Sequence, residues 1–445
     1  MCAMRALLNQ YLTVYDPGRI RPQLLALATF VRKGRLKKGE KRAVHYFQQD
    51  DVRVILPRGL WPIVARKWPM PVTDQRLRFT ARPFAWQGQL YAYQQPVVQA
   101  ILARQGGTLV AMPGSGKSIM GLALAAYWQQ PTLWLVSTQE LRRVAEEKAR
   151  TLFKLPDEAF GFIGDGEGHM GTHLTIGMVQ TLTQSAYWMA QLKPRIGAVI
   201  IDEAHHSPSN SFQSIINHFP AAYRLGLSAT PNRTDGLGPM MVSILGPRVV
   251  LPKRLLRLQD RILFPTVYLL GTAFQSHEGQ WAAMEKSRAR DRARNQLIVQ
   301  LILRGAQRRR KILVLVERRD HALLLAHTLV ARRIRAKALI SNVAAAERNQ
   351  WWDLVEAGRA VVIATRLANE GLDLPRLDYL ILGAAGRSAT RLEQQLGRGM
   401  RTAQGKADIE VYDLADWRIP AYAQQARERL AFYEQEGYPI RYTLA

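Results

Sequence analysis

Residues 111–118 have the residue types and spacing of a loop that binds phosphate. Gly114 and Gly116 let backbone N–H groups turn towards phosphate oxygens, and the apolar segment 119–128 is expected to form a helix whose amino end favours an anion. Lys117 would bridge the β- and γ-phosphates of a nucleotide, and the hydroxyl of Ser118 would ligate Mg²⁺. The predicted nucleotide contacts are Gly114, Ser115, Gly116, Lys117 and Ser118.

An acidic pair follows the apolar run 198–201, which is expected to be a buried strand. Asp202 leaves the end of that strand where it could hold Mg²⁺ through water, and Glu203 could orient or deprotonate the water that attacks the γ-phosphate. Such a pair often only caps a helix, but the phosphate loop upstream favours the catalytic interpretation. We therefore predict Ser118 and Asp202 as the Mg²⁺ ligands and Glu203 as the general base.

An arginine-bearing segment, 394–401, lies far along the chain from the phosphate loop. A loop that grips phosphate supplies little to stabilise the charge that develops during phosphoryl transfer, and guanidinium groups can supply that stabilisation. Arg398 and Arg401 could reach the nucleotide from another domain. A nucleotide site that is divided between domains can convert hydrolysis into domain movement.

The charge balance favours a polyanionic partner. Lys and Arg total 62 against 35 Asp and Glu, which gives a formal net charge of +27 and a pI near 10.6. This excess favours nucleic acid binding, although a generally Arg-rich proteome would also produce it. The single cysteine, Cys2, excludes an intrachain disulfide and a Cys-based zinc site, and a zinc site at His205 and His206 lacks further ligands.

We expect a cytoplasmic protein without a membrane partner. No apolar run reaches the ~18 residues that a membrane helix requires. The first residues lack the apolar core of a secretory signal.

The length and the order of the expected elements predict three domains. At 445 residues the chain is too long for one ordinary core. Residues 1–80 combine short β-like runs with the basic, glycine-punctuated segment 32–42. They are expected to form a small α+β accessory domain that either binds DNA or packs as an extension. Residues 81–250 and 251–445 alternate strand-like and helical segments, which predicts two parallel sheets covered on both faces. Residues 281–303 read as one long helical stretch.

The motifs occur in the order found in superfamily 2 helicases. The chain resembles the DEAH-type branch, which includes phage recombination and fork-remodelling DNA helicases. The resemblance rests on the Asp-Glu-Ala-His tetrad 202–205, the triplet 228–230 and the segment 394–401, and it covers about residues 85–415. Further segments resemble the adenine-reading motif (90–94), two nucleic-acid contact motifs (136–141 and 175–182) and motif V (363–375).

The resemblance implies two tandem RecA-like P-loop domains that use ATP and Mg²⁺. Gln94 is expected to contact the adenine base, and Gly371 and Asp373 of motif V are expected at the nucleotide. Arg398 and Arg401 are the implied arginine fingers, and Gln394 would contact the same γ-phosphate or the attacking water.

The remaining matched residues are implied to act between the nucleotide and the nucleic acid. Ser228 and Thr230 would couple the nucleotide state to the DNA side, or simply form a hydroxyl-capped turn. Thr138, Thr181 and Thr365 are candidates for contacts to backbone phosphates. Each of these threonines has an ordinary alternative as a helix cap or a strand residue.

The resemblance implies an ATP-dependent DNA helicase or translocase. It would act in DNA repair, recombination or replication, in a bacterial or phage-infected cell or at its nucleoid, on single-stranded and on branched or duplex DNA. An RNA helicase is the close alternative, which the basic N-terminal region and the DEAH tetrad disfavour. A clamp that binds DNA without unwinding it and the motor subunit of a restriction system also remain open.

Overall fold

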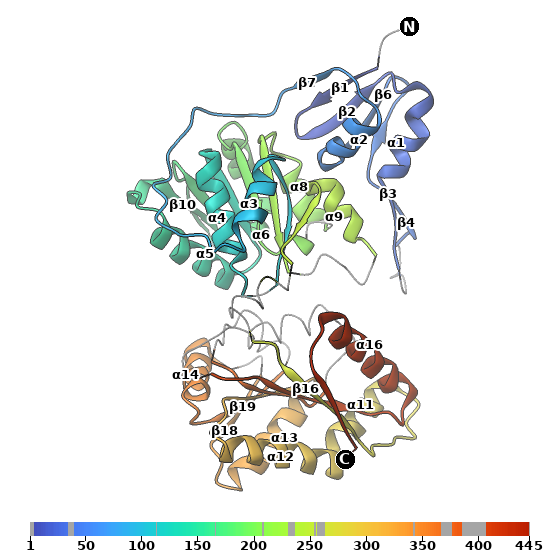
Figure 1. Cartoon of the computed structure of the whole chain (residues 1–445), viewed down its shortest axis with the longest axis vertical. Helices are drawn as coiled ribbons and strands as arrows, with labels where there is room; N and C mark the ends of the chain where they lie inside the picture. The colour runs from blue at the N-terminus through green and yellow to red at the C-terminus, as the bar shows by residue number, and fades with distance from the viewer. Residues whose placement is uncertain are drawn as a thin grey trace. The chain divides into compact units, whose positions relative to one another are not determined.

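The computed structural model describes residues 4–33, 40–112, 114–164, 166–206, 209–229, 236–252, 255, 263–340, 343–365, 376–384 and 406–444. The chain divides into two compact units, Met1–Leu255 and Leu256–Ala445, and Figure 1 labels many of their elements. The first unit holds a small mixed sheet and a large parallel one, and the second unit holds another parallel sheet. These sheets confirm the predicted fold class.

The small mixed sheet is formed by the N-terminal residues. Its strands follow the order β5-β6-β2-β1-β7; β7 runs parallel to β1, and the other pairs are antiparallel. Leu12 and Val14 of β2 are buried against Leu24 and Val64 of two short helices. The elements are β1 (Arg5–Leu8), β2 (Tyr11–Tyr15), η1 (Gly18–Ile20), α1 (Arg21–Leu27), β5 (Gln48–Gln49), β6 (Arg53–Pro57), η2 (Arg58–Leu60), α2 (Trp61–Lys67) and β7 (Val72–Asp74).

A separate hairpin joins this N-terminal part to the large sheet of the first unit. Its strands are β3 (Thr29–Val31) and β4 (Ala43–His45), on either side of the basic segment 32–42. Phe30 is buried in the same apolar cluster as Phe212 of the large sheet's covering layer. The hydroxyl of Tyr46 accepts a hydrogen bond from the side-chain amide of Asn217. The hairpin is therefore part of the first unit's core rather than a free arm.

The large sheet of the first unit has the strand order β11-β10-β12-β9-β13-β14-β8-β15. All neighbours pair in parallel except β10 and β11, which form an antiparallel hairpin. The strands are β8 (Gly106–Val110), β9 (Thr132–Val136), β10 (Phe160–Gly164), β11 (Glu167–His169), β12 (Leu174–Met178), β13 (Ala198–Ile201), β14 (Tyr223–Ser228) and β15 (Arg248–Val250).

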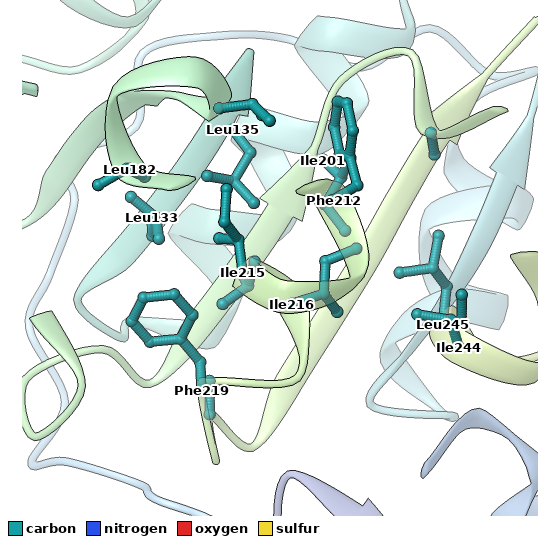
Figure 2. Packing of buried hydrophobic residues seen from close by; sticks show 14 of the residues in the cluster. Leu133, Leu135, Leu182, Ile201, Phe212, Ile215, Ile216, Phe219, Ile244 and Leu245 are labelled. Atoms are coloured by element: carbon teal, nitrogen blue, oxygen red, sulfur yellow. The ribbon is translucent and has the colours of Figure 1, made fainter. Parts of the chain in front are cut away.

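Helices cover both faces of this sheet, and its inner strands β8, β9, β12 and β13 are buried throughout. On one face α4 packs so closely that a Cβ at Gly121 would lie 2.9 Å from the ring of Trp134. On the other face Leu133 and Leu135 pack with Leu182, Ile215 and further apolar side chains (Figure 2). The helices are α3 (Gln95–Leu102), α4 (Lys117–Trp128), α5 (Gln139–Leu152), η3 (Asp157–Ala159), α6 (Val179–Gln184), α7 (Ala186–Leu192), η4 (Ala204–His206), α8 (Asn210–Ile216) and α9 (Gly238–Leu245).

Two buried arginines tie the N-terminal part to the large sheet. Arg58 of η2 donates to the backbone carbonyls of Asn9 (3.1 Å) and Ala221 (2.6 Å). Arg224 of β14 donates across the junction to the carbonyl of Gln10 (3.5 Å), and within the large-sheet part to the carbonyls of Ile216 (2.9 Å) and Ile244 (3.2 Å). Burial lowers the pKa of Arg224 to about 10, so its guanidinium is still protonated at neutral pH. These hydrogen bonds offset the cost of burying two cations and make the junction a specific one.

The sheet of the second unit is parallel throughout, with the order β18-β19-β17-β20-β21-β16-β22. Residues of α12 and α13 share one apolar cluster with the sheet. The elements are β16 (Thr266–Gly271), α11 (Trp281–Arg290), α12 (Arg292–Gln307), β17 (Ile312–Val316), α13 (Arg319–Val330), β18 (Ala336–Leu339), α14 (Ala345–Glu356), β19 (Val361–Thr365), β20 (Tyr379–Leu382), β21 (Glu410–Ala415), α16 (Pro420–Glu436) and β22 (Ile440–Leu444).

Two details of the second unit differ from the sequence-based expectation. The stretch 281–303 forms two helices rather than one, because Asp291 adopts an extended backbone and its carboxylate caps α12 by accepting from the N–H of Arg294 (2.8 Å). The last strand, β22, was not expected, and it pairs with β16, which lies about 170 residues earlier. Within the described ranges, none of the helices combines the length and the apolar character needed to cross a membrane.

Candidate active site

The phosphate loop lies between the end of β8 and the start of α4. Gly114 and Gly116 both have φ of 83°, the left-handed region that favours glycine. A Cβ at Gly116 would lie 2.4 Å from the side-chain nitrogen of Gln94. The glycine at 116 is therefore required twice, by its backbone conformation and by a close neighbour.

Gln94 is buried beneath this loop. Its Oε1 accepts a hydrogen bond from the N–H of Tyr91 (3.0 Å), and its Nε2 donates to the carbonyl of Ser115 (3.0 Å). The hydroxyl of Tyr93 also lies 3.4 Å from that carbonyl. The structure thus places Gln94 against the phosphate loop, where it fixes the loop's shape. The expected contact of Gln94 with an adenine base stays a prediction.

Lys117 and Ser118 open helix α4. The Nζ of Lys117 donates to the carbonyls of Ala111 (3.0 Å) and Met112 (3.2 Å), so the ammonium lies over the loop that it helps to form. Ser115 donates its hydroxyl to the carbonyl of Met112 (2.6 Å), which tightens the same turn. Ser118 is half-buried on the first turn of the helix, beside the N–H groups that have no partner within it. The arrangement suits a bound phosphate chain.

Asp202 follows β13 and is buried at the same edge of the sheet. The strands β13, β14 and β8 are parallel neighbours, so their carboxyl ends meet at one edge. Burial, together with the charge of Glu203, raises the pKa of Asp202 to about 6, and the nearby charge of Lys117 opposes that shift. Two adjacent carboxylates in a buried position are stabilised by a divalent cation. The residues present therefore fit a Mg²⁺ held by Asp202 and Ser118.

Glu203 has an unusual backbone conformation for its residue type. Its φ is 50°, in the left-handed region, and its N–H donates to the carboxylate of Asp202 (3.0 Å). Its own carboxylate oxygen Oε2 lies 3.2 Å from Nδ1 of His205. Strained residues of this kind cluster at functional sites, because the surrounding structure must hold them in place. The contact with His205 was not foreseen, although the two residues are only two positions apart in the Asp-Glu-Ala-His tetrad.

Ser228 ends the strand that lies between the phosphate loop and the acidic pair. It is fully buried, and its carbonyl accepts a hydrogen bond from the N–H of Ala111 (3.1 Å). This bond links β14 directly to the first residue of the phosphate loop. Its proposed coupling partner Thr230 lies outside the described residues.

The candidate nucleic-acid contacts Thr138, Thr181 and Thr365 occupy different settings. Thr138 caps helix α5 by accepting from the N–H of Leu141 (3.2 Å). This residue therefore serves as a helix cap, whether or not it also contacts phosphate. Thr181 lies on the short helix α6, and Thr365 is buried at the end of β19. The side chain of Gln180 donates to the carbonyl of Ser137 (2.8 Å) and joins the two motifs of the first unit. That link was missed in the sequence, because nothing in a glutamine on a helix indicates its partner.

The remaining predicted site residues lie outside the described residues. They are Gln394, Arg398 and Arg401 of the arginine-bearing segment and Gly371 and Asp373 of motif V.

Two family models match the chain in tandem. Residues 87–233 match the family "Type III restriction enzyme, res subunit", and residues 293–403 match the family "Helicase conserved C-terminal domain". The first match contains the phosphate loop and the Asp-Glu-Ala-His tetrad, and the second contains the arginine-bearing segment.

Curated relatives agree with these families. "Probable helicase D10" of Escherichia phage T5 is 26% identical over 331 residues, which is 73% of this chain and 71% of the relative. "DNA 3'-5' helicase XPB" of Kineococcus radiotolerans is 24% identical over 79% of this chain and 64% of the relative. "DNA 3'-5' translocase XPB2" of Sulfurisphaera tokodaii is 33% identical over a shorter stretch, 36% of this chain and 35% of the relative.

Solved structures show the same fold at low sequence identity. The helicase domain of Hef from Pyrococcus furiosus superposes with a TM-score of 0.53 at 16% identity, over 75% of this chain and 96% of that one. The Type ISP restriction-modification enzyme LlaBIII gives a TM-score of 0.59 at 16% identity, over 82% of this chain and 32% of that one. With two tandem parallel-sheet domains, the two family matches and these relatives, the chain belongs to the superfamily 2 helicases.

Proposed function

We propose that the protein is an ATP-dependent DNA translocase or helicase. The observation that carries the proposal is the convergence of Lys117, Asp202 and Glu203 at one edge of the first parallel sheet. Burial and the neighbouring charge of Glu203 raise the pKa of Asp202, and the charge of Lys117 opposes that rise. A binding module that only holds nucleotide would need the loop but not a second, strained carboxylate beside it.

Hydrolysis then follows from the roles of these side chains. Lys117 would neutralise the β- and γ-phosphates, and Mg²⁺ held by Ser118 and Asp202 would add positive charge there. Glu203 would orient the attacking water and accept its proton, with His205 fixing the direction of the carboxylate. Arg398 and Arg401 would stabilise the charge of the transition state, with Gln394 beside them, and such arginines contribute about 10³ or more in rate in related systems.

Coupling to movement would pass through β14 and the second domain. We propose three domains, 1–80, 81–250 and 251–445, of which the last two are the motor. The hydrogen bond from Ala111 to the carbonyl of Ser228 supports a role for residues 228–230 as sensors of the phosphate loop. Gly371 and Asp373 would complete the nucleotide site. Loss of the γ-phosphate would release the arginine contacts and let the domains separate.

DNA is the proposed partner because of the relatives and the charge. Two of the relatives described above are named as DNA helicases or translocases, and this chain carries a net charge of +27. Thr138, Thr181 and Thr365 would contact backbone phosphates, so binding would tolerate many sequences and weaken steeply with salt. We place the activity in DNA repair, recombination or replication. An RNA helicase and a DNA clamp that does not unwind are the alternatives.

The decisive experiment is ATP hydrolysis measured without nucleic acid and with single-stranded DNA, forked DNA or RNA. We expect strong stimulation by DNA that Lys117→Ala abolishes. Stimulation by RNA alone would contradict the choice of DNA. DNA-stimulated hydrolysis without strand separation in a helicase assay would favour a translocase or clamp over a helicase.

The N-terminal part is proposed to bind duplex or branched DNA through its basic hairpin. Deleting residues 1–80 is a poor test, because it would remove Phe30 and Tyr46 from the packing of the first unit. Replacing the exposed Lys33 and Lys41 of the hairpin by glutamine leaves that packing in place. We expect this variant to lose affinity for forked DNA and to keep its affinity for single strands; equal losses on both would remove the special role of the hairpin.

A further inference from the structure

The beginnings of four neighbouring strands in the second unit bring exposed arginines together. Because β18, β19, β17 and β20 are parallel neighbours, all of them begin at the same edge of the sheet. Exposed arginines shortly precede each of these strands. We call the following residues the arginine edge: Arg309, Arg332, Arg333, Arg335, Arg359 and Arg376.

Most acidic side chains close to this edge pair with cations outside it, and the carboxylate of Glu356 accepts from the backbone N–H of Arg376 (3.4 Å). Arg308 and Arg310 pair with Glu410 at 2.7 and 3.2 Å, and Arg310 also pairs with Asp408. Lys311 lies 3.7 Å from the buried Asp378. Among the described residues, the side chains of Arg309, Arg332, Arg333, Arg359 and Arg376 have no ion pair with a carboxylate. The edge therefore keeps a local excess of positive charge.

Two of these arginines occupy a backbone conformation that ordinarily favours glycine. Helices α12, α13 and α14 end in the same kind of turn, closed by hydrogen bonds from Arg310 to Gly305, from Ile334 to Leu329 and from Arg359 to Leu354. The left-handed position of this turn holds Gly358 after α14, with φ of 66°. It holds Arg309 (φ 53°) after α12 and Arg333 (φ 62°) after α13.

The helix ends alone do not explain these arginines. A cation near a helix carboxyl end is favourable, because that end carries partial negative charge. Helix α4 of the first unit, however, ends in a left-handed Gln129, and Gln105 after α3 has φ of 59°. Helix α16 ends in a left-handed Gly437. Neutral residues occupy the left-handed position after these helices, so a helix end does not require arginine there. We therefore attribute the arginines at 309 and 333 to a partner outside the fold.

We propose that the arginine edge binds the phosphate backbone of a second segment of nucleic acid, apart from the segment held by the motor. The proposal rests on the proposed function, which supplies DNA as the partner. The edge lies at the beginnings of the strands, whereas Thr365 lies at the end of β19, on the opposite edge of the same sheet.

The dimensions of the edge suit a polyphosphate. Three intervals between the four strands span roughly 14 Å at about 4.8 Å each. One strand of duplex DNA presents a phosphate about every 3.4 Å along the helix axis, so the edge is long enough to span several phosphates of one strand. Arginine suits this role because its planar guanidinium binds phosphate through two hydrogen bonds. The duplex arm of a forked substrate is the segment that we assign to this surface.

The test uses Arg309→Gln/Arg333→Gln, because glutamine is already accepted in the same backbone conformation at Gln105 and Gln129. We expect about tenfold weaker binding to forked DNA at physiological salt, with the slope of log affinity against log salt reduced by about 2. Hydrolysis stimulated by a short oligothymidylate, which occupies the motor alone, should be unchanged. Arg309→Lys/Arg333→Lys should restore most of the affinity.

A matched control removes the same charge elsewhere. Arg195 and Arg427 are both exposed and lie outside the arginine edge, so Arg195→Gln/Arg427→Gln should leave the salt slope close to that of the parent. Thermal unfolding of both double variants checks that the fold is intact. The proposal would be overturned if Arg309→Gln/Arg333→Gln left the slope of log affinity against log salt unchanged, or if the control variant reduced that slope equally.

The outcomes also separate this inference from the proposed function. If no DNA stimulates ATP hydrolysis by the parent protein, the proposed function itself is contradicted. Suppose that DNA stimulates the parent protein, but that Arg309→Gln/Arg333→Gln binds forked DNA normally and loses binding to poly-glutamate. This result would overturn the inference alone, because an acidic protein would then be the partner of this surface.

Discussion

The carboxylate oxygen Oε2 of Glu203 lies 3.2 Å from Nδ1 of His205, so the imidazole limits the directions that the proposed general base can take. Both side chains are mostly buried, so water competes little for the contact. Because His205 acts through Glu203, it is a positioning residue. We expect His205→Ala to lower kcat for ATP about tenfold, with little change in KM, whereas His205→Gln, which keeps a hydrogen-bond donor, should retain more activity. Steady-state ATP hydrolysis measures both; a large rise in KM in His205→Ala would assign the histidine to nucleotide binding instead.

Glu203→Gln should separate nucleotide binding from hydrolysis. The substitution keeps the shape of the side chain and leaves Lys117, Ser118 and Asp202 in place, but it removes the base. We expect kcat to fall by about 10²–10⁴ while ATP still binds, so that the protein stays longer on DNA in the presence of ATP. Single-turnover hydrolysis and the rate of DNA release are the measurements. Hydrolysis at the parental rate would show that another group activates the water.

The pH dependence of hydrolysis should report Asp202. Its pKa is raised to about 6 by burial and by Glu203, and the ionised form is the one that can hold Mg²⁺. Activity should therefore be lost as the pH falls through about 6. Higher Mg²⁺ should move this midpoint to lower pH, because the cation binds only the ionised carboxylate. An acid midpoint that does not respond to Mg²⁺ would assign the titration to a different group.

The same shift predicts how stability varies with pH when no divalent cation is present. A carboxyl group whose pKa is higher in the folded than in the unfolded chain binds its proton more tightly when folded. The free energy of unfolding should therefore decrease as the pH rises from about 4 to about 6, and Asp202→Asn should weaken that decrease. Thermal unfolding in a chelator across this range is the measurement, and a stability that rises through the window would contradict the sign.

The sequence predicted the two parallel sheets because most of their strands are apolar runs. The bounds expected for β13, 198–201, agree with the structure, since a strand buried on both faces has no polar residues to blur its ends. The break between α11 and α12 escaped detection because Asp291 has no proline or glycine beside it to mark the cap. Strand β22 escaped because its pairing with β16 depends on distant residues.

The chemistry of the candidate site was easier to predict than its internal contacts. Lys117, Asp202 and Glu203 follow strand ends, and parallel topology brings such positions together without knowledge of their side chains. The contact of Gln94 with Ser115 and that of Gln180 with Ser137 depend on how loops fold over each other. No spacing rule describes such contacts, so only the structure reveals them.

The junction between the N-terminal part and the large sheet should depend strongly on Arg224. Replacing it by methionine removes the buried charge and the hydrogen bond to the carbonyl of Gln10 across the junction, and it leaves the carbonyls of Ile216 and Ile244 without this donor. We expect the free energy of unfolding to fall by about 3 kcal/mol. Denaturant unfolding measures the loss, with the exposed Arg195→Gln as the control. A loss as small as that of the control would show that the apolar contacts of Phe30 and its neighbours hold the junction alone.

The hydrogen bond from Arg58 to Ala221 joins residues that are 163 positions apart in the sequence. During translation at about 5–20 residues per second, the N-terminal residues would therefore wait roughly ten to thirty seconds for their partner to be synthesised. Throughout that interval Phe30 would lack the apolar surroundings that it has in the finished protein. The growing chain is thus exposed to aggregation at its beginning, and protection of the nascent N-terminus by a chaperone should raise the yield of folded protein.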